Sequence, residues 1–428
     1  MRHCAGRSAR SRWAEAALAL AICWLPGCTG LFQRQLPDHA AAFAAADHGA
    51  LRAGFAIEDI TPEGAPYLGG FGLNRRATGV DSRLTVRALV LVVGETRVAL
   101  VGIDTLGLQR HDVEWIKSGI DGFTNGCVFL CSSHTHAAPD PIGLWGKYML
   151  TSGRDRAYIA RVGHAVRDAV RRALDSAAPA RLVCGESRMP ADGLLRNSNR
   201  PDVFDRRITI LQARSAADEP IGSLIHFACH PEVLRRGDSL VSADFVGRLC
   251  DRWEAAGHGP AMFVNGALGA MISPRLHGQQ NLDVAGDMLL GWAESALEGA
   301  EPVEGDELEI RRRDVYLPMK SWALRLARLT TVIPRHVYAG ALRSTLGYLR
   351  IGDFEACCVP GEAEPGYARR IVAASGRARL RVFGLVDDEV GYLMSERDAR
   401  DPEFAYERTM APGPRAGEIL LEVLVGDE

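Results

Sequence analysis

The chain has 428 residues, of which 47% are hydrophobic, and its formal net charge at pH 7 is -3. This length and composition predict a globular body with a sizeable core, built as one large domain or two modest ones. A charge so close to neutral gives no broad attraction to a polyanion, so we expect no nucleic-acid partner.

The first 28 residues have the composition of a bacterial export signal. Arginines at positions 2, 7, 10 and 12 precede an apolar run over residues 16–25 that is too short to span a bilayer. The run ends in Leu25-Pro-Gly-Cys28, which resembles a lipobox, in which Cys28 becomes the lipidated first residue of the mature protein. We expect export to the periplasm or cell envelope with a lipid on Cys28 as membrane anchor. Simple secretion and an uncleaved anchor are the alternatives.

An alanine-rich stretch follows the signal, and residues 29–51 are expected to form a linker. Residues 52–428 are expected to form the folded domain. Seven of the ten cysteines lie beyond the signal, mostly within apolar strands. We therefore expect buried free thiols, with one disulfide as the alternative.

Apolar periodicity divides the domain into strands and helices. Strands are predicted at residues 53–62, 84–93, 97–104, 180–184, 207–213, 221–230, 262–265, 308–316, 344–351, 354–359 and 380–385, the second and third as a hairpin. Helices are predicted at residues 112–120, 155–176, 242–256, 280–297, 322–329, 366–374 and at the C-terminal end. This pattern predicts an α/β fold with mixed β-sheets packed against helices.

Two apolar runs end in histidine. Residues 127–131 lead into His134-Thr-His136, and a second run ends in His230-Pro231. Strand ends that deliver histidines from distant segments can build a metal site, because ligands of α/β proteins gather beyond such ends. Two residues apart, His134 and His136 would point to opposite faces of a straight strand. A bend is therefore expected, with one imidazole for a metal and the other for proton transfer or packing; a chance His-x-His pair is the alternative.

Other candidate side chains are less distinctive. His226 is interpreted as a core histidine, and Ser273, after a glycine-rich loop, as a routine turn serine unless other evidence favours catalysis. Glu362 stands at a strand end, where it equally fits a helix N-terminal carboxylate. Tyr392 alone would be interpreted as a strand tyrosine packed on the core.

Together these segments resemble the catalytic domain of the neutral (non-lysosomal) ceramidase family, over residues 54–424. The resemblance implies one Zn²⁺ per chain, bound by His134, His230, Glu362 and Tyr392. It also implies catalytic roles for four residues: an active-site Ser273, His136 beside the zinc, Tyr406 facing the scissile carbonyl, and an arginine from Arg196-Asn-Ser-Asn-Arg200, for which we prefer Arg200.

Two departures from the family stand out. Met271 occupies a position, two before the serine, where the family has an acidic or amide residue. The chain also stops near Leu424, so we expect no immunoglobulin-like C-terminal domain.

The implied ligand set suits amide hydrolysis, because zinc lowers the pKa of a bound water to about 7 and polarises a carbonyl. His136 would relay a proton to the leaving amine, Tyr406 and the arginine would stabilise the oxyanion, and Ser273 would orient the substrate or attack it. The expected function is a zinc-dependent amidohydrolase cleaving an N-acyl sphingosine (ceramide) or a related N-acyl lipid amide.

Five apolar residues near the first histidine segment favour an amphipathic substrate, or simply belong to the core: Ile142, Leu144, Trp145, Tyr148 and Met149. Two other functions stay open. One is a hydrolase of a non-lipid amide or ester, favoured by the missing C-terminal domain. The other is a catalytically degenerate binding lipoprotein, favoured by Met271.

Overall fold

The computed structural model describes residues 39–426, with gaps at residues 40, 191–192 and 271. The expected export signal with Cys28, and Met271, therefore lie outside the described residues. Strand β1 (Ala41–His48) falls within the expected linker and pairs antiparallel with β15 (Glu307–Pro318). The linker prediction is wrong for this stretch, because its alanine-rich composition hides a period-two alternation of exposed and partly buried side chains.

The larger of two main sheets has nine strands in the order β12-β10-β9-β7-β2-β4-β5-β6, with β14 paired to β7. Strands β4 and β6 are buried throughout, which explains why they appear in the sequence as continuous apolar runs. The bounds of the nine strands are β2 (Leu51–Asp59), β4 (Thr85–Val93), β5 (Thr96–Ile103), β6 (Val128–Ser132), β7 (Ala178–Arg188), β9 (Arg207–Ser215), β10 (Pro220–Phe227), β12 (Ala261–Asn265) and β14 (Glu301–Pro302).

The second sheet has five strands in the order β1-β15-β16-β17-β19, where β16 is Ala341–Ile351, β17 is Phe354–Cys358 and β19 is Arg381–Phe383. It packs against the larger sheet through one apolar cluster. Leu100 and Phe129 of the nine-stranded sheet meet Leu308 and Leu349 of the five-stranded sheet there. Because both sheets combine parallel and antiparallel pairs, the predicted α/β class with mixed sheets is confirmed.

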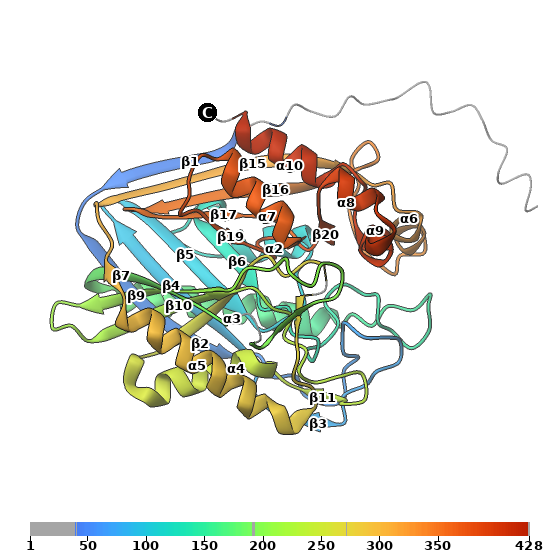
Figure 1. Cartoon of the computed structure of the whole chain (residues 1–428), viewed down its shortest axis with the longest axis horizontal. Helices are drawn as coiled ribbons and strands as arrows, with labels where there is room; N and C mark the ends of the chain where they lie inside the picture. The colour runs from blue at the N-terminus through green and yellow to red at the C-terminus, as the bar shows by residue number, and fades with distance from the viewer. Residues whose placement is uncertain (1–38, 40, 191–192, 271, 427–428) are drawn as a thin grey trace, which may run out of the picture. The chain divides into compact units, whose positions relative to one another are not determined.

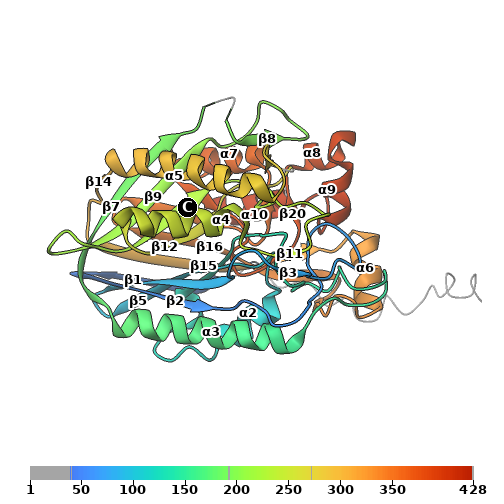
Figure 2. The same cartoon turned by 90° about the horizontal axis from the view of Figure 1, so that it is seen from below.

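Helices cover the outer faces. Figure 2 shows α4 (Asp244–Trp253) and α5 (Leu282–Glu298) on one side of the strands and α3 (Arg156–Asp175) on the other. In Figure 1, α7 (Pro365–Ala374) and α10 (Ala416–Val425) lie over the five-stranded sheet, where their apolar side chains join its core. The short elements are α2 (Arg110–Lys117), α6 (Trp322–Leu329), α8 (Glu396–Arg400), α9 (Ala405–Met410), β3 (Gly79–Val80), β8 (Leu195–Asn197), β11 (Leu240–Val241), β13 (Ile272–Pro274), β18 (Glu362–Ala363) and β20 (Tyr392–Leu393).

The larger sheet folds back on itself, so that β12 lies against β5. A Cβ atom on Gly102 of β5 would stand 3.0 Å from the carbonyl oxygen of Phe263 in β12, so the close approach requires glycine. At the end of β12, the side chain of Asn265 donates hydrogen bonds to the carbonyl oxygens of Ser133 (2.8 Å) and Cys229 (3.0 Å). These contacts bring together the chain segments that follow β6 and β10.

All seven cysteines of the described chain are free, and six of them are buried, as expected. Within the described ranges, no helix combines the length and apolar character that crossing a bilayer requires.

Candidate active site

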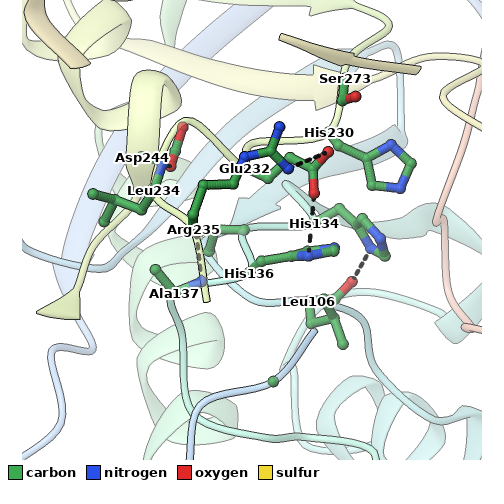
Figure 3. Close-up of polar contacts among 12 residues, drawn as sticks. Leu106, His134, His136, Ala137, His230, Glu232, Leu234, Arg235, Asp244 and Ser273 are labelled. Atoms are coloured by element: carbon green, nitrogen blue, oxygen red, sulfur yellow. Dashed lines mark hydrogen bonds and ion pairs between the residues drawn. The ribbon is translucent and has the colours of Figure 1, made fainter. Parts of the chain in front are cut away.

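The segment after β6 bends sharply at His134, whose φ of 70° lies in the left-handed region. The bend brings both histidines of the motif into one buried cluster, with the ring centroids of His134 and His136 5.0 Å apart. His230, which follows β10, joins them with its ring centroid 4.9 Å from that of His134 (Figure 3). Two apolar strands therefore do deliver their histidines to one place.

Backbone carbonyl groups fix two of these imidazoles. The Nδ1 atom of His134 lies 2.6 Å from the carbonyl oxygen of Leu106, and Nδ1 of His230 lies 2.8 Å from that of Ile272. A carbonyl oxygen only accepts, so each Nδ1 carries a hydrogen, and each Nε2 faces Glu362 in the cluster.

Glu362 completes this arrangement from β18, a short strand that follows β17 of the five-stranded sheet and pairs only with β20. Its Oε2 atom lies 3.1 Å from Nε2 of His230 and 3.7 Å from Nε2 of His134. Strands β18 and β20 place Glu362 beside Tyr392, and the two side chains are hydrogen-bonded. The four residues named as zinc ligands thus lie together in the fold.

Burial sets the protonation of the cluster. It lowers the pKa of His134 to about 4 and lowers the pKa of His136 well below its usual range. Burial also acts to lower the pKa of His230, but the hydrogen bond and charge of Glu362 outweigh it and raise that pKa. A metal binds neutral imidazoles and an ionised carboxylate, so at His230 it would displace the proton that Glu362 favours.

The donor set fits a divalent transition metal. Ring nitrogens of His134, His136 and His230 lie within 4.8 Å of one another, as do ligand atoms of His134, Glu362 and Glu389. Nitrogen and carboxylate oxygen donors at such separations suit zinc and its first-row neighbours.

Ser273 and Arg196, one of the two candidate arginines, lie on paired short strands. Ser273 of β13 is opposite Arg196 of β8, and the Arg196 guanidinium donates to Ser273 Oγ at 3.4 Å. Arg200 instead forms ion pairs with Asp401, at 2.6 Å, and with Glu403. The structure thus places Arg196, and not the preferred Arg200, beside Ser273, through a strand register that the sequence does not show.

A cavity of about 80 Å³, measured as the space open to the centre of a water molecule, lies beside the cluster. His134, His136, Glu362, Tyr392 and Tyr406 line it together with apolar side chains, including Ile142, Leu144, Trp145, Leu324 and Ile333. The rings of Tyr392 and Tyr406 lie 6.1 Å apart, so the more exposed Tyr406 stands next to the ligand cluster.

The five apolar residues of the first histidine segment separate into two groups. Ile142, Leu144 and Trp145 line the cavity, whereas Tyr148 and Met149 are 61% and 74% exposed. The five residues are therefore neither all part of the core nor all placed to contact a substrate in the cavity.

Three further polar residues at the site were not identified from the sequence. Figure 3 shows Glu232 between His136 and Arg235, with its Oε2 atom 3.7 Å from His136 Nδ1. Asn265 joins the two histidine segments, and Glu389 faces Glu362. Glu232 lies two residues after His230, and Glu389 lies three residues before Tyr392. This proximity along the chain was the only sign in the sequence that they belong to the site.

Comparison with known proteins assigns the family. A sequence model of the neutral/alkaline non-lysosomal ceramidases, N-terminal part, matches residues 51–286. The chain belongs to this family. The matched range contains His134, His136, His230 and Ser273, while Glu362 and Tyr392 lie beyond it.

A curated protein and two solved structures are also similar to the chain. Neutral ceramidase B of Dictyostelium discoideum is 24% identical over 229 residues, which cover 48% of this chain and 32% of that protein. This chain thus spans about a third of the length of that curated relative. The crystal structure of neutral ceramidase from Pseudomonas aeruginosa matches with a TM-score of 0.72 at 18% identity, over 89% of this chain and 74% of that one. A ceramidase structure in complex with C2 matches equally well, over 88% of this chain, and both likenesses support the fold.

Proposed function

We propose that this protein is a zinc-dependent amidohydrolase that cleaves an N-acyl sphingosine (ceramide) or a related N-acyl lipid amide. The observation that carries the proposal is the convergence of His134, His230 and Glu362 from three distant segments, beside an apolar cavity that His134 and Glu362 line. Membership of the ceramidase family supports the reaction class.

A bound zinc ion supplies a Lewis acid that lowers the pKa of water to about 7 and polarises the scissile carbonyl. His134 and His230 would hold it through Nε2, since each Nδ1 is occupied by a carbonyl group. Glu362 and Tyr392 would contribute oxygen donors and offset the positive charge in a buried site.

His136 would move the proton. Its Nδ1 faces the Glu232 carboxylate at 3.7 Å, and a carboxylate there stabilises the imidazolium that forms when the other ring nitrogen takes up a proton. The imidazolium would then give its proton to the leaving amine, as a general acid. Tyr406 and Arg196 would donate hydrogen bonds to the developing oxyanion, and Ser273, beside Arg196, would orient the substrate or attack it.

The apolar lining of the cavity favours a substrate with a lipid-like acyl or sphingoid chain, which the cavity would hold. Its apolar walls come from residues 142–145 and from α6, whose Leu324 and Ala327 pack with Leu144 and Trp145. Burying a methylene group contributes about 0.8 kcal/mol, so a long chain would contribute more to binding than a short polar one.

The test is a substrate panel measured with and without a chelator. Fluorescent N-acyl sphingosine should be hydrolysed, short N-acyl amino acids much more slowly, and a chelator should abolish turnover until zinc is restored. The His230→Ala variant should lose both the metal and the activity. Faster turnover of the short amides would support a non-lipid hydrolase, and absence of turnover with zinc bound would support a binding protein.

We also propose export and anchoring through a lipid on Cys28. Detergent phase partitioning of the full chain should place the wild type in the detergent phase and Cys28→Ser in the aqueous phase. Equal partitioning of the two would contradict the anchor.

A further inference from the structure

Resting on the proposed function, we infer that Glu389 is an additional ligand of the metal, which this chain would hold with two carboxylates instead of one. Glu389 lies on the loop between β19 and β20, three residues before Tyr392. Ligand atoms of Glu389, His134 and Glu362 all lie within 4.8 Å of one another. Two donors about 2.0–2.2 Å from one ion are about 3–4 Å apart, so a small closure around the ion suffices.

The carboxylate is held in the way that orients a ligand. The backbone N–H of Gly391 donates to Glu389 Oε1 at 2.7 Å. The second oxygen, Oε2, is enclosed and accepts no hydrogen bond from any described residue. One oxygen fixed by the backbone and one without a partner among the described residues is the arrangement of a carboxylate that binds through a single oxygen.

Neighbouring residues keep the stem of Glu389 in place. A Cβ atom on Gly107 would stand 2.7 Å from Cβ of Glu389, so this glycine allows the two segments to pack closely. The Arg335 guanidinium donates to the Glu389 carbonyl oxygen at 2.8 Å and pairs with Asp388 at 2.6 Å. The guanidinium thus anchors the backbone at Glu389. No described residue donates a hydrogen bond to Oε2, so this oxygen can bind another partner.

Charge favours a cation at this point. Glu362 and Glu389 are two carboxyl groups whose ligand atoms lie within 4.8 Å of each other at one edge of the cavity. A divalent ion between them would neutralise both. Glu389 lines the cavity together with Glu362 and His134, so it also borders the space where a substrate carbonyl would lie.

Metal binding tests the inference without relying on turnover. Zinc affinity would be measured by competition with a chromophoric chelator, and coordination by the visible spectrum of the cobalt-substituted full-length protein. Three variants are compared with the wild type: Glu389→Gln, Glu364→Gln and His230→Ala. Glu364 is the matched control, because it is buried, lies two residues from Glu362, and caps α7 through the N–H of Tyr367.

We expect Glu389→Gln to weaken zinc binding about 10- to 100-fold and to intensify the cobalt bands, because intensity rises as coordination number falls. Glu364→Gln should match the wild type in both readouts. If Glu389→Gln keeps the wild-type affinity and spectrum while His230→Ala loses the metal, the inference is overturned and the proposed function stands. If the wild type binds neither zinc nor cobalt, the proposed function fails as well.

Discussion

Asn265 holds the two histidine-bearing segments together. Its amide nitrogen donates to the carbonyl oxygens of Ser133 and Cys229, and its Oδ1 atom accepts from the Cys229 N–H at 3.2 Å. These three hydrogen bonds, made by a fully buried side chain, fix the starting points of the segments that carry His134 and His230. One amide thus sets the distance between two proposed ligands.

The Asn265→Ala variant should be less stable and should bind zinc more weakly. Leaving buried carbonyl and N–H groups without partners costs about 1–3 kcal/mol each, so we expect a loss of about 3 kcal/mol after relaxation. Urea unfolding measures the stability, and chelator competition the zinc affinity. Asn281→Ala, which removes a side-chain hydrogen bond to His277 outside the core, is the control and should change neither by much.

His226 should make stability fall at acid pH. Burial lowers its pKa to about 4, below the ordinary 6.5, so between these values the unfolded chain binds more protons than the folded one. The unfolding free energy therefore falls as pH drops from about 6.5 to about 4, by about 3 kcal/mol from this residue.

Urea unfolding at a series of pH values measures this dependence. His226→Gln, which keeps a donor for the carbonyl oxygen of Val382, should show a shallower decline than the wild type. The exposed His48→Gln should leave the decline unchanged. Parallel curves for His226→Gln and the wild type would contradict the assignment.

Helix α6 has apolar side chains on both sides. Leu324 and Ala327 pack toward the cavity, while Trp322, Leu326 and Leu329, at positions i, i+4 and i+7, form an exposed stripe. Trp322 and Leu329 are each 73% exposed. Residues 315–352 contain arginines and one lysine but neither aspartate nor glutamate. An exposed apolar stripe in a basic segment is suited to contact with a lipid surface beside the cavity.

Replacing the stripe should therefore affect lipid-embedded substrates selectively. We expect Trp322→Ser combined with Leu329→Ser to reduce turnover of N-acyl sphingosine in anionic vesicles about tenfold. Turnover of a water-soluble short-chain analogue should stay near the wild-type value, since these side chains point away from the cavity. Val284→Ser, at a 45% exposed position of α5, is the control. An equal loss on both substrates would indicate a damaged cavity instead.

Helices and strands with strong apolar periodicity could be predicted from the sequence. Short strands that form only by pairing with a distant segment could not. Helix α6 was predicted with the bounds observed, and α3 within one residue at each end, because Asp155 caps it and its apolar side chains recur at helical spacing. Strands β8, β13, β18 and β20 have two or three residues each, too few to show a period. Their pairing nevertheless places Ser273 beside Arg196 and Glu362 beside Tyr392.

A buried ion network joins the two sheets. The carboxylate of Asp387 lies 2.7 Å from Lys117 of α2 and 2.5 Å from Arg312 of β15, and it accepts the N–H of Leu130 in β6 at 2.9 Å. All three charged side chains are buried. Asp387 therefore links the nine-stranded sheet, the five-stranded sheet and α2. It lies on the segment that leads to Glu389 and Tyr392.

The Asp387→Asn variant should destabilise the whole protein by about 3–5 kcal/mol, because it leaves Lys117 and Arg312 without a buried counter-charge. Asparagine tolerates the positive φ of 64° found there, so backbone strain does not confuse the result. Thermal unfolding measures the loss. Asp218→Asn is the matched control: Asp218 also has a positive φ, of 66°, but pairs with Arg214 at the surface, so only a small loss is expected.

The site as a whole was only partly accessible from the sequence. Strand-end histidines indicated a metal, but the link to Glu362 and Tyr392 came from the family resemblance, because residues 130 to 260 positions apart show no pattern. The choice of Arg196, and the contributions of Glu232, Asn265 and Glu389, depend on strand register and on the fold-back of β12 against β5. Such long-range packing has no local signature.

Anomalous X-ray diffraction at the zinc edge, from crystals of the zinc-loaded protein, tests the central proposal most directly. We expect a single strong peak about 2.0–2.2 Å from Nε2 of His134, Nε2 of His230 and an oxygen of Glu362, with Tyr392 beside it. A zinc peak elsewhere in the molecule, with this cluster empty, would contradict the proposed active site.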